Sequence, residues 1–192
     1  MRIPTQKECF RLIRKMEMMD HIVDHSVMVS HVSLFLCRSL KKRYPNLNTE
    51  LVTSAALLHD ITKTRSFTTG EIHSDTGGQM LSNLGYPEVG EIIRQHVVLD
   101  EYSDQPPVTN QEIVNYSDKR VLHDRIVSLN RRLMYIERTY VKSEKLKQRF
   151  KRMRQQSIDL ESKLFRFLSI TPSQLSDAVL ERVNPDRSKS KI

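Results

Sequence analysis

Cysteine and glycine are scarce in this sequence, with two and five among 192 residues. Cys9 and Cys37 lie far apart and form no CxxC pair, which excludes a disulfide framework and a thiolate zinc site. No apolar run approaches the length that spans a bilayer, and residues 1–17 lack the apolar segment and cleavage site of a signal peptide. We therefore expect a cytoplasmic protein without a membrane partner.

The pattern of apolar residues predicts an all-α fold. Few glycines and 28% charged residues are typical of a protein rich in helix, and no alternating strand pattern is present. We expect a core in residues 1–125, a basic helical extension in 126–183 that packs on it, and a frayed tail in 184–192. Residues 62–70 and 100–109 are predicted loops. The predicted helices are 5–18, 21–43, 49–60, 73–84, 88–97, 110–122 and 124–168.

The run from Leu57 to Asp60 is the most informative stretch. His59 and Asp60 stand side by side where an apolar segment ends, directly after four apolar residues. A charged group rarely lies against such a core unless it is paired or bound to a metal. The dipeptide therefore indicates a site.

Further histidines and an aspartate lie along the same helical framework, each beside an apolar face. Imidazole and carboxylate without thiolate suit Mn, Fe, Ni, Co, Zn or Mg, and one aspartate can bridge two ions. A bridging Asp60 with several histidines would build a two-metal site of the kind that hydrolyses phosphate esters. The candidate ligands, in chain order, are His25, His59, Asp60, His73, His96 and Asp118.

Each ligand candidate also has a structural interpretation. A single histidine on an apolar helix face is more often a hydrogen-bonded core residue, and Asp118 alone is typical of a helix surface. His21 lies one turn before His25 and could exchange roles with it, whereas His31 matches no ligand position. The second dipeptide, His123-Asp124, is followed by no further histidines, so we interpret it as solvated helix residues.

The ordered set resembles the HD-domain metal-dependent phosphohydrolases over roughly residues 20–125. It comprises His25-Ser26 with Val29, then Leu58-His59-Asp60-Ile61, His73 with Gly77 and Leu81, His96, and Asp118. The resemblance implies an HD-domain helical bundle. It also implies a first metal on His25, His59, Asp60 and Asp118, and a second near His73 and His96 with Asp60 between them. Thr62 replaces the glycine of many relatives, and Gly85-Tyr86-Pro87 is interpreted as a turn.

Cations near these ligands are the candidates for substrate binding. HD enzymes that cleave nucleotide phosphates often carry a lysine just after the HD pair, which makes Lys63 attractive. Arg65 follows it, and Lys119 and Arg120 directly follow the last ligand. All four could instead be solvated surface charges.

The expected function is divalent-metal-dependent hydrolysis of a nucleotide, dinucleotide or related phosphate ester. One or two ions would lower the pKa of a water, whose hydroxide attacks phosphorus, with Asp60 and Lys63 as catalytic residues. A non-catalytic regulatory protein that binds a nucleotide or RNA is the alternative. A third possibility is oxygen activation by two irons. The C-terminal helices could also form a homodimer face.

The excess positive charge is concentrated at the C-terminus. Residues 1–130 hold 15 Lys and Arg against 16 Asp and Glu, while residues 131–192 hold 16 against 7. Residues 142–154 contain seven Lys or Arg and one Glu, which suits either a solvated helix face or a nucleic-acid footprint. Phe150 is the only aromatic residue there, so a base-stacking platform is unsupported.

Neutralising part of this segment separates the two interpretations. A footprint predicts nucleic-acid binding that falls steeply with salt and weakens in the neutralised variant, whereas equal binding would leave a solvated face. The residues to neutralise are Lys147, Arg149, Lys151 and Arg152.

Overall fold

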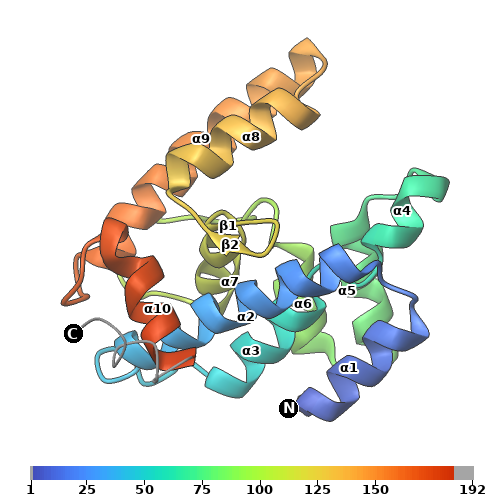
Figure 1. Cartoon of the computed structure of the whole chain (residues 1–192), viewed down its shortest axis with the longest axis horizontal. Coiled ribbons are helices and arrows are strands. Elements are labelled where there is room, and N and C mark those ends of the chain that lie inside the picture. The colour runs from blue at the N-terminus through green and yellow to red at the C-terminus, as the bar shows by residue number, and fades with distance from the viewer. Residues whose placement is uncertain (1, 184–192) are drawn as a thin grey trace, which may run out of the picture.

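Helix α2 (Asp20–Leu40) runs through the middle of the fold (Figure 1). The computed structural model describes residues 2–183, and α2 contacts α3 and α7 on its flanks and α10 near its end. Its sequence has apolar or small residues on all sides, which explains how it can be buried so extensively. The elements are α1 (Gln6–Lys15), α2 (Asp20–Leu40), α3 (Thr49–Leu58), α4 (Lys63–Thr69), α5 (His73–Asn83), α6 (Pro87–Arg94), α7 (Asn110–Asp118), β1 (Val121–Leu122), β2 (Arg125–Ile126), α8 (Leu129–Tyr140), α9 (Glu144–Phe165), the 3₁₀ helix η1 (Pro172–Gln174) and α10 (Leu175–Val183).

Side-chain caps fix where several helices begin. Thr5 and Glu8 form a capping box at α1, and Thr109 and Glu112 form a second one at α7. Asn48 accepts hydrogen bonds from two backbone amides at the start of α3. Helix α3 then buries most of its side chains and ends directly before His59. The predicted all-α class is confirmed, with a two-residue hairpin as the only strand pair in residues 2–183.

Helices α5 and α6 pack unusually closely. Their facing glycines, Gly78 and Gly90, bring the two backbones into contact, and a Cβ at Gly78 would lie 2.7 Å from the Gly90 carbonyl oxygen. Only glycine avoids that overlap at either position. His73 is the first residue of α5, and His96 follows α6 by two residues, so this close packing links the two helices that position them.

The expectation of a loop at residues 62–70 was wrong, because residues 63–69 form helix α4. This helix buries none of its side chains and therefore shows no apolar periodicity in the sequence. Gly70 ends it in the left-handed conformation, with φ at 70°, which is a common helix terminator.

The predicted continuous helices at 110–122 and 124–168 were also too long. The chain leaves α7 after Asp118 and turns through a hairpin in which Leu122 pairs with Arg125. Ser128 and Ser143 then cap two separate helices, α8 and α9. These two helices lie side by side as an arm that projects from the body of the fold (Figure 1).

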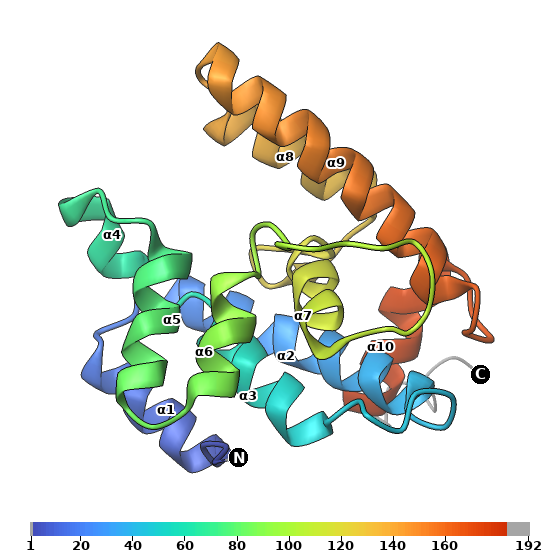
Figure 2. The same ribbon diagram turned by 180° about the vertical axis from the view of Figure 1, so that it is seen from behind.

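The base of α9 is tied to the body through a buried ion pair. The Lys163 Nζ lies 2.7 Å from Glu112 Oε1 on α7 and donates a hydrogen bond of 2.9 Å to the Ser103 carbonyl. Figure 2 shows the long segment between α6 and α7 passing along this junction. The division into a core at residues 1–125 and an extension at 126–183 stays a prediction. The predicted frayed tail at 184–192 lies outside the described residues.

The glycine contact between α5 and α6 generates a stability prediction. Gly90→Ala should lower the free energy of unfolding by about 1–3 kcal/mol, because the new methyl group collides with the Gly78 carbonyl and forces the helices apart. Urea unfolding measures this change. Gln79→Ala, at an exposed position of α5, is the control and should change stability by less than about 0.5 kcal/mol. A stable Gly90→Ala protein would contradict the close packing described above.

Candidate metal centre

Six predicted ligands converge from five helices. Each sits at a helix terminus or on the buried face of α2, so its position is fixed by the packing of a whole element. The positions are His25 within α2, His59 and Asp60 directly after α3, His73 as the first residue of α5, His96 just after α6, and Asp118 as the last residue of α7.

The first group of ligand atoms surrounds one oxygen of Asp118. Its Oδ1 lies 3.1 Å from His25 Nε2 and 3.8 Å from His59 Nε2. All three residues are buried, with exposed fractions of 6% for His25, 0% for His59 and 8% for Asp118. One ion can reach all three ligand atoms, because these lie within 4.8 Å of one another.

The second group surrounds Asp60. One of its oxygens, Oδ2, lies 3.4 Å from His59 Nε2, which belongs to the first group. The other oxygen, Oδ1, lies 3.3 Å from His73 Nε2 and 3.6 Å from His96 Nε2. Asp60 therefore directs its two oxygens toward two different sets of imidazoles, which is the arrangement that a bridging carboxylate requires.

Backbone carbonyls orient three of the imidazoles. The Nδ1 atoms of His25, His59 and His96 donate hydrogen bonds to carbonyl oxygens at 2.9, 2.8 and 2.7 Å. A carbonyl only accepts, so each Nδ1 carries the proton and each Nε2 presents its lone pair to the centre. This is the outer-shell arrangement typical of metal-binding histidines. The accepting carbonyls belong to His123, Ala56 and Ile93.

Two atoms at the middle of the cluster have no hydrogen-bond partner among the described residues. They are His59 Nε2 and Asp60 Oδ1, on residues that are 0% and 1% exposed. Buried polar atoms without partners are costly, and divalent cations bound at the two groups of ligand atoms would satisfy them. The donor set of nitrogen and carboxylate oxygen therefore fits one or two divalent ions.

The pKa directions agree with metal binding. Burial lowers the pKa of His96 to about 4 and also lowers that of His25, so both imidazoles stay neutral. Burial raises the pKa of Asp60, but the Lys63 ammonium together with His59 and His73 holds it well below the ordinary value. Asp118 behaves similarly beside Lys119. Metal binding needs neutral imidazoles and ionised carboxylates, and these residues supply both.

His59 differs from the other two buried histidines. Burial lowers its pKa, but the charge and hydrogen bond of Asp60, together with the charge of Asp118 and the Ala56 carbonyl, raise it to a net increase. The raised pKa means that a divalent ion would compete with a proton for the unpartnered Nε2 of His59.

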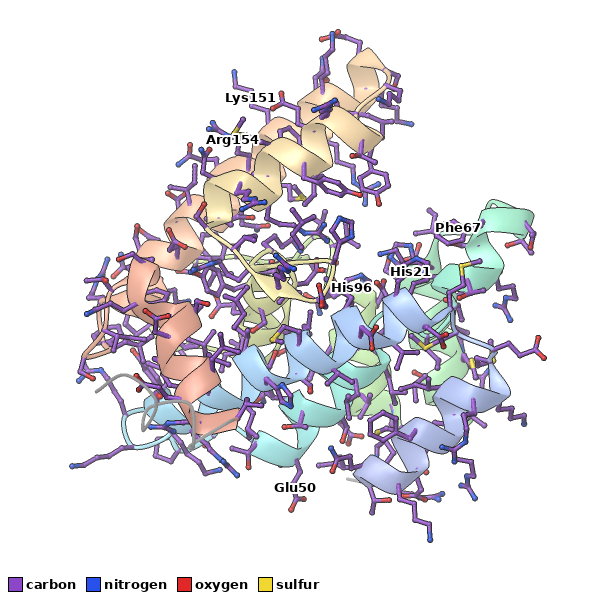
Figure 3. All side chains as sticks on the ribbon, in the orientation of Figure 1. His21, Glu50, Phe67, His96, Lys151 and Arg154 are labelled. Atoms are coloured by element: carbon purple, nitrogen blue, oxygen red, sulfur yellow. The ribbon has the colours of Figure 1, made fainter. Side chains whose placement is uncertain are left out.

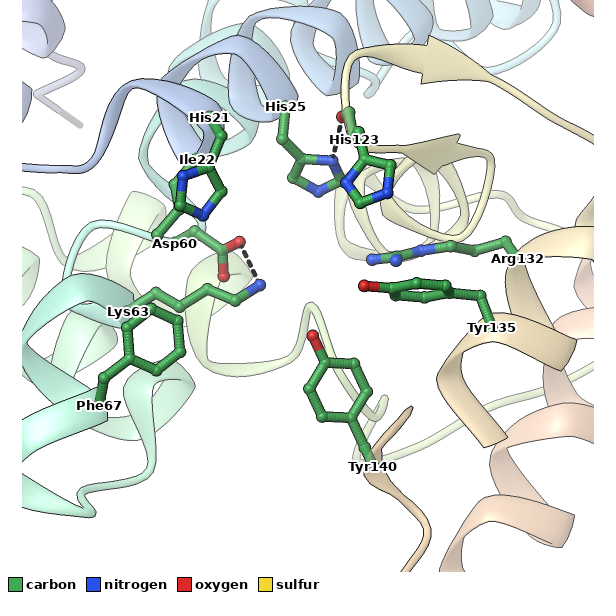
Figure 4. A pocket seen from close by; sticks show the side chains of 10 residues that line it. All are labelled: His21, Ile22, His25, Asp60, Lys63, Phe67, His123, Arg132, Tyr135 and Tyr140. Atoms are coloured by element: carbon green, nitrogen blue, oxygen red, sulfur yellow. Dashed lines mark hydrogen bonds and ion pairs between the residues drawn. The ribbon is translucent and has the colours of Figure 1, made fainter. Parts of the chain in front are cut away.

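A pocket of about 180 Å³ opens onto the ligands (Figure 4). Lys63 is the predicted substrate-binding cation that lines it, and its Nζ lies 2.7 Å from Asp60 Oδ2. The pocket lies between α2, α4, the hairpin turn and α8. Its lining residues are His21, Ile22, His25, Asp60, Lys63, Phe67, His123, Arg132, Tyr135 and Tyr140.

The structure does not bring the other three predicted cations to this pocket. Arg65 points to the outside of α4, where its Nε lies 2.8 Å from Glu71 Oε1. Lys119 is only 1% exposed, because its ammonium donates to the His96 carbonyl behind the ligands. Its charge acts on Asp118, at 3.4 Å, from that side.

Arg120 is part of the protein interior. Its guanidinium donates to the Val127 and Pro172 carbonyls, to the Tyr116 hydroxyl and to the Glu161 carboxylate. With its donors engaged and an exposed fraction of 2%, it joins α7 to α9 and to the start of η1. Its contacts are structural.

The interpretation of His123 and Asp124 as helix residues was wrong, because they form the turn of the hairpin. His123 has a φ of 55°, lines the pocket, and uses its backbone carbonyl to hold His25. His21 lines the pocket from one turn before His25, while His25 takes the ligand position. The contact between His25 and the His123 carbonyl could not be predicted from the sequence, because every residue type carries a backbone carbonyl.

Four further pocket residues were missed in the sequence. Arg132, Tyr135 and Tyr140 come from α8, inside the segment that was assigned to the extension, and Phe67 comes from α4. Arg132 and Tyr135 are three residues apart and therefore share a helix face. That spacing was a usable signal, but nothing in the sequence places α8 against the ligands.

The basic segment 142–154 begins at the end of the arm and continues along α9. All seven of its Lys and Arg residues are exposed. Figure 3 shows Lys151 and Arg154 on the edge of the arm away from His96 and His21. Nucleic-acid binding through this segment stays a prediction.

The fold and these residues together define an all-α protein with a buried cluster of histidines and aspartates that could hold a metal. A family model described as "HD domain" matches residues 22–161, and this chain belongs to the HD domain family of metal-dependent phosphohydrolases. The match extends through α8 and most of α9, so it includes the helix that closes the pocket.

Comparisons with individual proteins add little detail. A search of curated proteins found no match. Among solved structures, the chain is similar to a predicted HD superfamily hydrolase from an uncultured Thermotogales bacterium, with 21% identity and a TM-score of 0.49, covering 86% of this chain and 90% of that one. Within residues 2–183, no helix has the length and apolar character needed to cross a membrane.

Metal removal tests the centre directly. We expect Mn²⁺ at a hundredfold excess over its dissociation constant to stabilise the fold by about 3 kcal/mol, which corresponds to a rise in Tm of roughly 5–10 °C. Chelation by EDTA should reverse the rise in a thermal melt. Asp60→Asn should abolish it, while His31→Gln, which changes a histidine outside the cluster, should preserve it. An undiminished rise in Asp60→Asn would show that metal binds elsewhere.

Proposed function

We propose that this protein is a divalent-metal-dependent phosphohydrolase that acts on a nucleotide, dinucleotide or related phosphate ester. The observation that carries this proposal is the orientation of Asp60, whose two oxygens face two separate sets of imidazoles. Two ions held in that way are typical of enzymes that displace a group at phosphorus. The substrate class and the catalytic step are our inference.

Bound divalent ions would supply a water of lowered pKa and polarise a phosphoryl oxygen. His25, His59 and Asp118 would hold one ion, and His73 and His96 the other, with Asp60 shared between them. The protein keeps these groups rigid, because four of the six follow or begin helices that are packed on their neighbours. Rigid ligands lower the reorganisation needed during the reaction.

Lys63 is the cation best placed to bind substrate. Its side chain is 24% exposed, so the ammonium can contact an anion in the pocket while it remains 2.7 Å from Asp60 Oδ2. Burial lowers its pKa, but the charge and hydrogen bond of Asp60 together with the charge of Asp118 give a net increase, so Lys63 stays protonated. A fixed positive charge here would stabilise negative charge on a phosphoryl oxygen.

Aromatic residues at the pocket mouth support a nucleotide rather than a small phosphate alone. Phe67 is 59% exposed and Tyr140 is 52% exposed, yet both line the pocket from different helices. Exposed aromatic rings beside an anion site suit a base that stacks while its phosphate reaches the ligands. Figure 4 shows the Phe67 ring beside Lys63 and the Tyr140 ring coming from the side of α8.

Asp60→Ala tests the proposal, because it removes the shared ligand. We expect loss of the bound metal and a fall in phosphate release of at least about a thousandfold, measured with a panel of phosphomonoesters, cyclic nucleotides and dinucleoside polyphosphates. Asp124→Ala, in the other His-Asp dipeptide, is the matched control and should keep both properties. Metal-dependent hydrolysis that persists in Asp60→Ala would refute the assignment. Oxidised products without phosphate release would favour iron-based oxygen chemistry instead.

A further inference from the structure

Arg132 is a buried arginine whose donors are mostly unengaged. It is 8% exposed and lines the pocket from α8. Its hydrogen bond to a protein group is a long one, 3.4 Å from Nη2 to Asp118 Oδ1, and its Nε has no partner among the described residues. A guanidinium has five donors, so this one has capacity for an anion.

Unengaged donors are not a general property of the buried arginines in this protein, as Arg120 shows. Arg120 also lies within the fold, and its guanidinium donates to two carbonyls, a hydroxyl and a carboxylate. Arg132 shares its one carboxylate with His25, whose Nε2 is closer to the same oxygen at 3.1 Å. Burying a guanidinium with so few contacts is costly unless a ligand completes them.

Arg132 faces Lys63 across the pocket. Figure 4 shows the guanidinium beside the Tyr135 ring, directed toward the side that carries Asp60 and Lys63. Each of the two cations contacts a different carboxylate, because Lys63 contacts Asp60 and Arg132 contacts Asp118. An anion bound over the ligands would therefore meet a positive charge on each side.

We propose that Arg132 is a substrate-binding residue that grips a phosphate group of the substrate from α8, opposite Lys63. The proposal rests on the proposed function and extends it, since it assigns the phosphate contact to the arm and not only to the helices that carry the ligands. A guanidinium binds two phosphate oxygens side by side, which a lysine cannot reproduce. Asp118 then keeps its role as a metal ligand, and Arg132 acts on the substrate.

The test uses the full chain loaded with Mn²⁺ and two variants, Arg132→Gln and Arg132→Lys. Calorimetry measures the affinity for Mn²⁺ and then, in the metal-loaded protein, the affinity for inorganic phosphate. We expect Mn²⁺ affinity within about threefold of the wild type and phosphate affinity lower by about 10- to 100-fold in Arg132→Gln. Arg132→Lys should recover only part of the loss and provides a second variant if Arg132→Gln fails to fold.

Arg131→Gln is the matched control, because Arg131 is exposed on the same helix and does not line this pocket. It should bind Mn²⁺ and phosphate like the wild type. A kinetic assay with p-nitrophenyl phosphate adds a second measurement, in which KM should rise in the Arg132 variants and stay unchanged in Arg131→Gln.

Three outcomes would overturn the proposal. Phosphate affinity in Arg132→Gln equal to that of the wild type would exclude a substrate contact. A loss of Mn²⁺ affinity as large as the loss of phosphate affinity would instead make Arg132 a residue that positions Asp118. If the metal-loaded wild type neither bound phosphate nor hydrolysed any ester, the proposed function would fail together with this inference.

Discussion

The buried carboxylate of Asp60 is the constraint on which the rest of the structure depends. An ionised group that is 1% exposed at the end of an apolar helix is stable only when positive or polar groups surround it. Lys63 supplies one charge, and His59, His73 and His96 come close on the other sides. Three helix termini must meet at one point to provide them. The buried Asp60 carboxylate is therefore stable only when α3, α5 and α6 pack so that these termini meet.

The sequence was sufficient to select the candidate ligands that the structure brings together, because their signal is local. His59 and Asp60 stand out beside an apolar run, and the other candidate ligands follow in the order and spacing of an HD domain. The family match over residues 22–161 confirms that the chain belongs to this family. The fold class followed from the absence of alternating strands. The fold class and the polar residues that stand beside apolar helical segments were therefore predictable from the sequence.

The rest depends on long-range packing that no local pattern encodes. Helix α4 was missed because it buries none of its side chains, and the break between α8 and α9 depends on serine caps inside an otherwise helical composition. Arg120 and Arg132 are both buried arginines, yet one is saturated by interior partners and the other faces the pocket. Only the position of α8 relative to the ligands separates them.

The contact between His25 and the His123 carbonyl makes one metal ligand depend on the course of the backbone through the hairpin. Any amino acid that tolerates the left-handed turn offers the same oxygen, so this contact depends on the shape of the turn and not on the imidazole of His123. The turn leads directly into α8, so the hairpin joins the arm to the backbone carbonyl that orients His25.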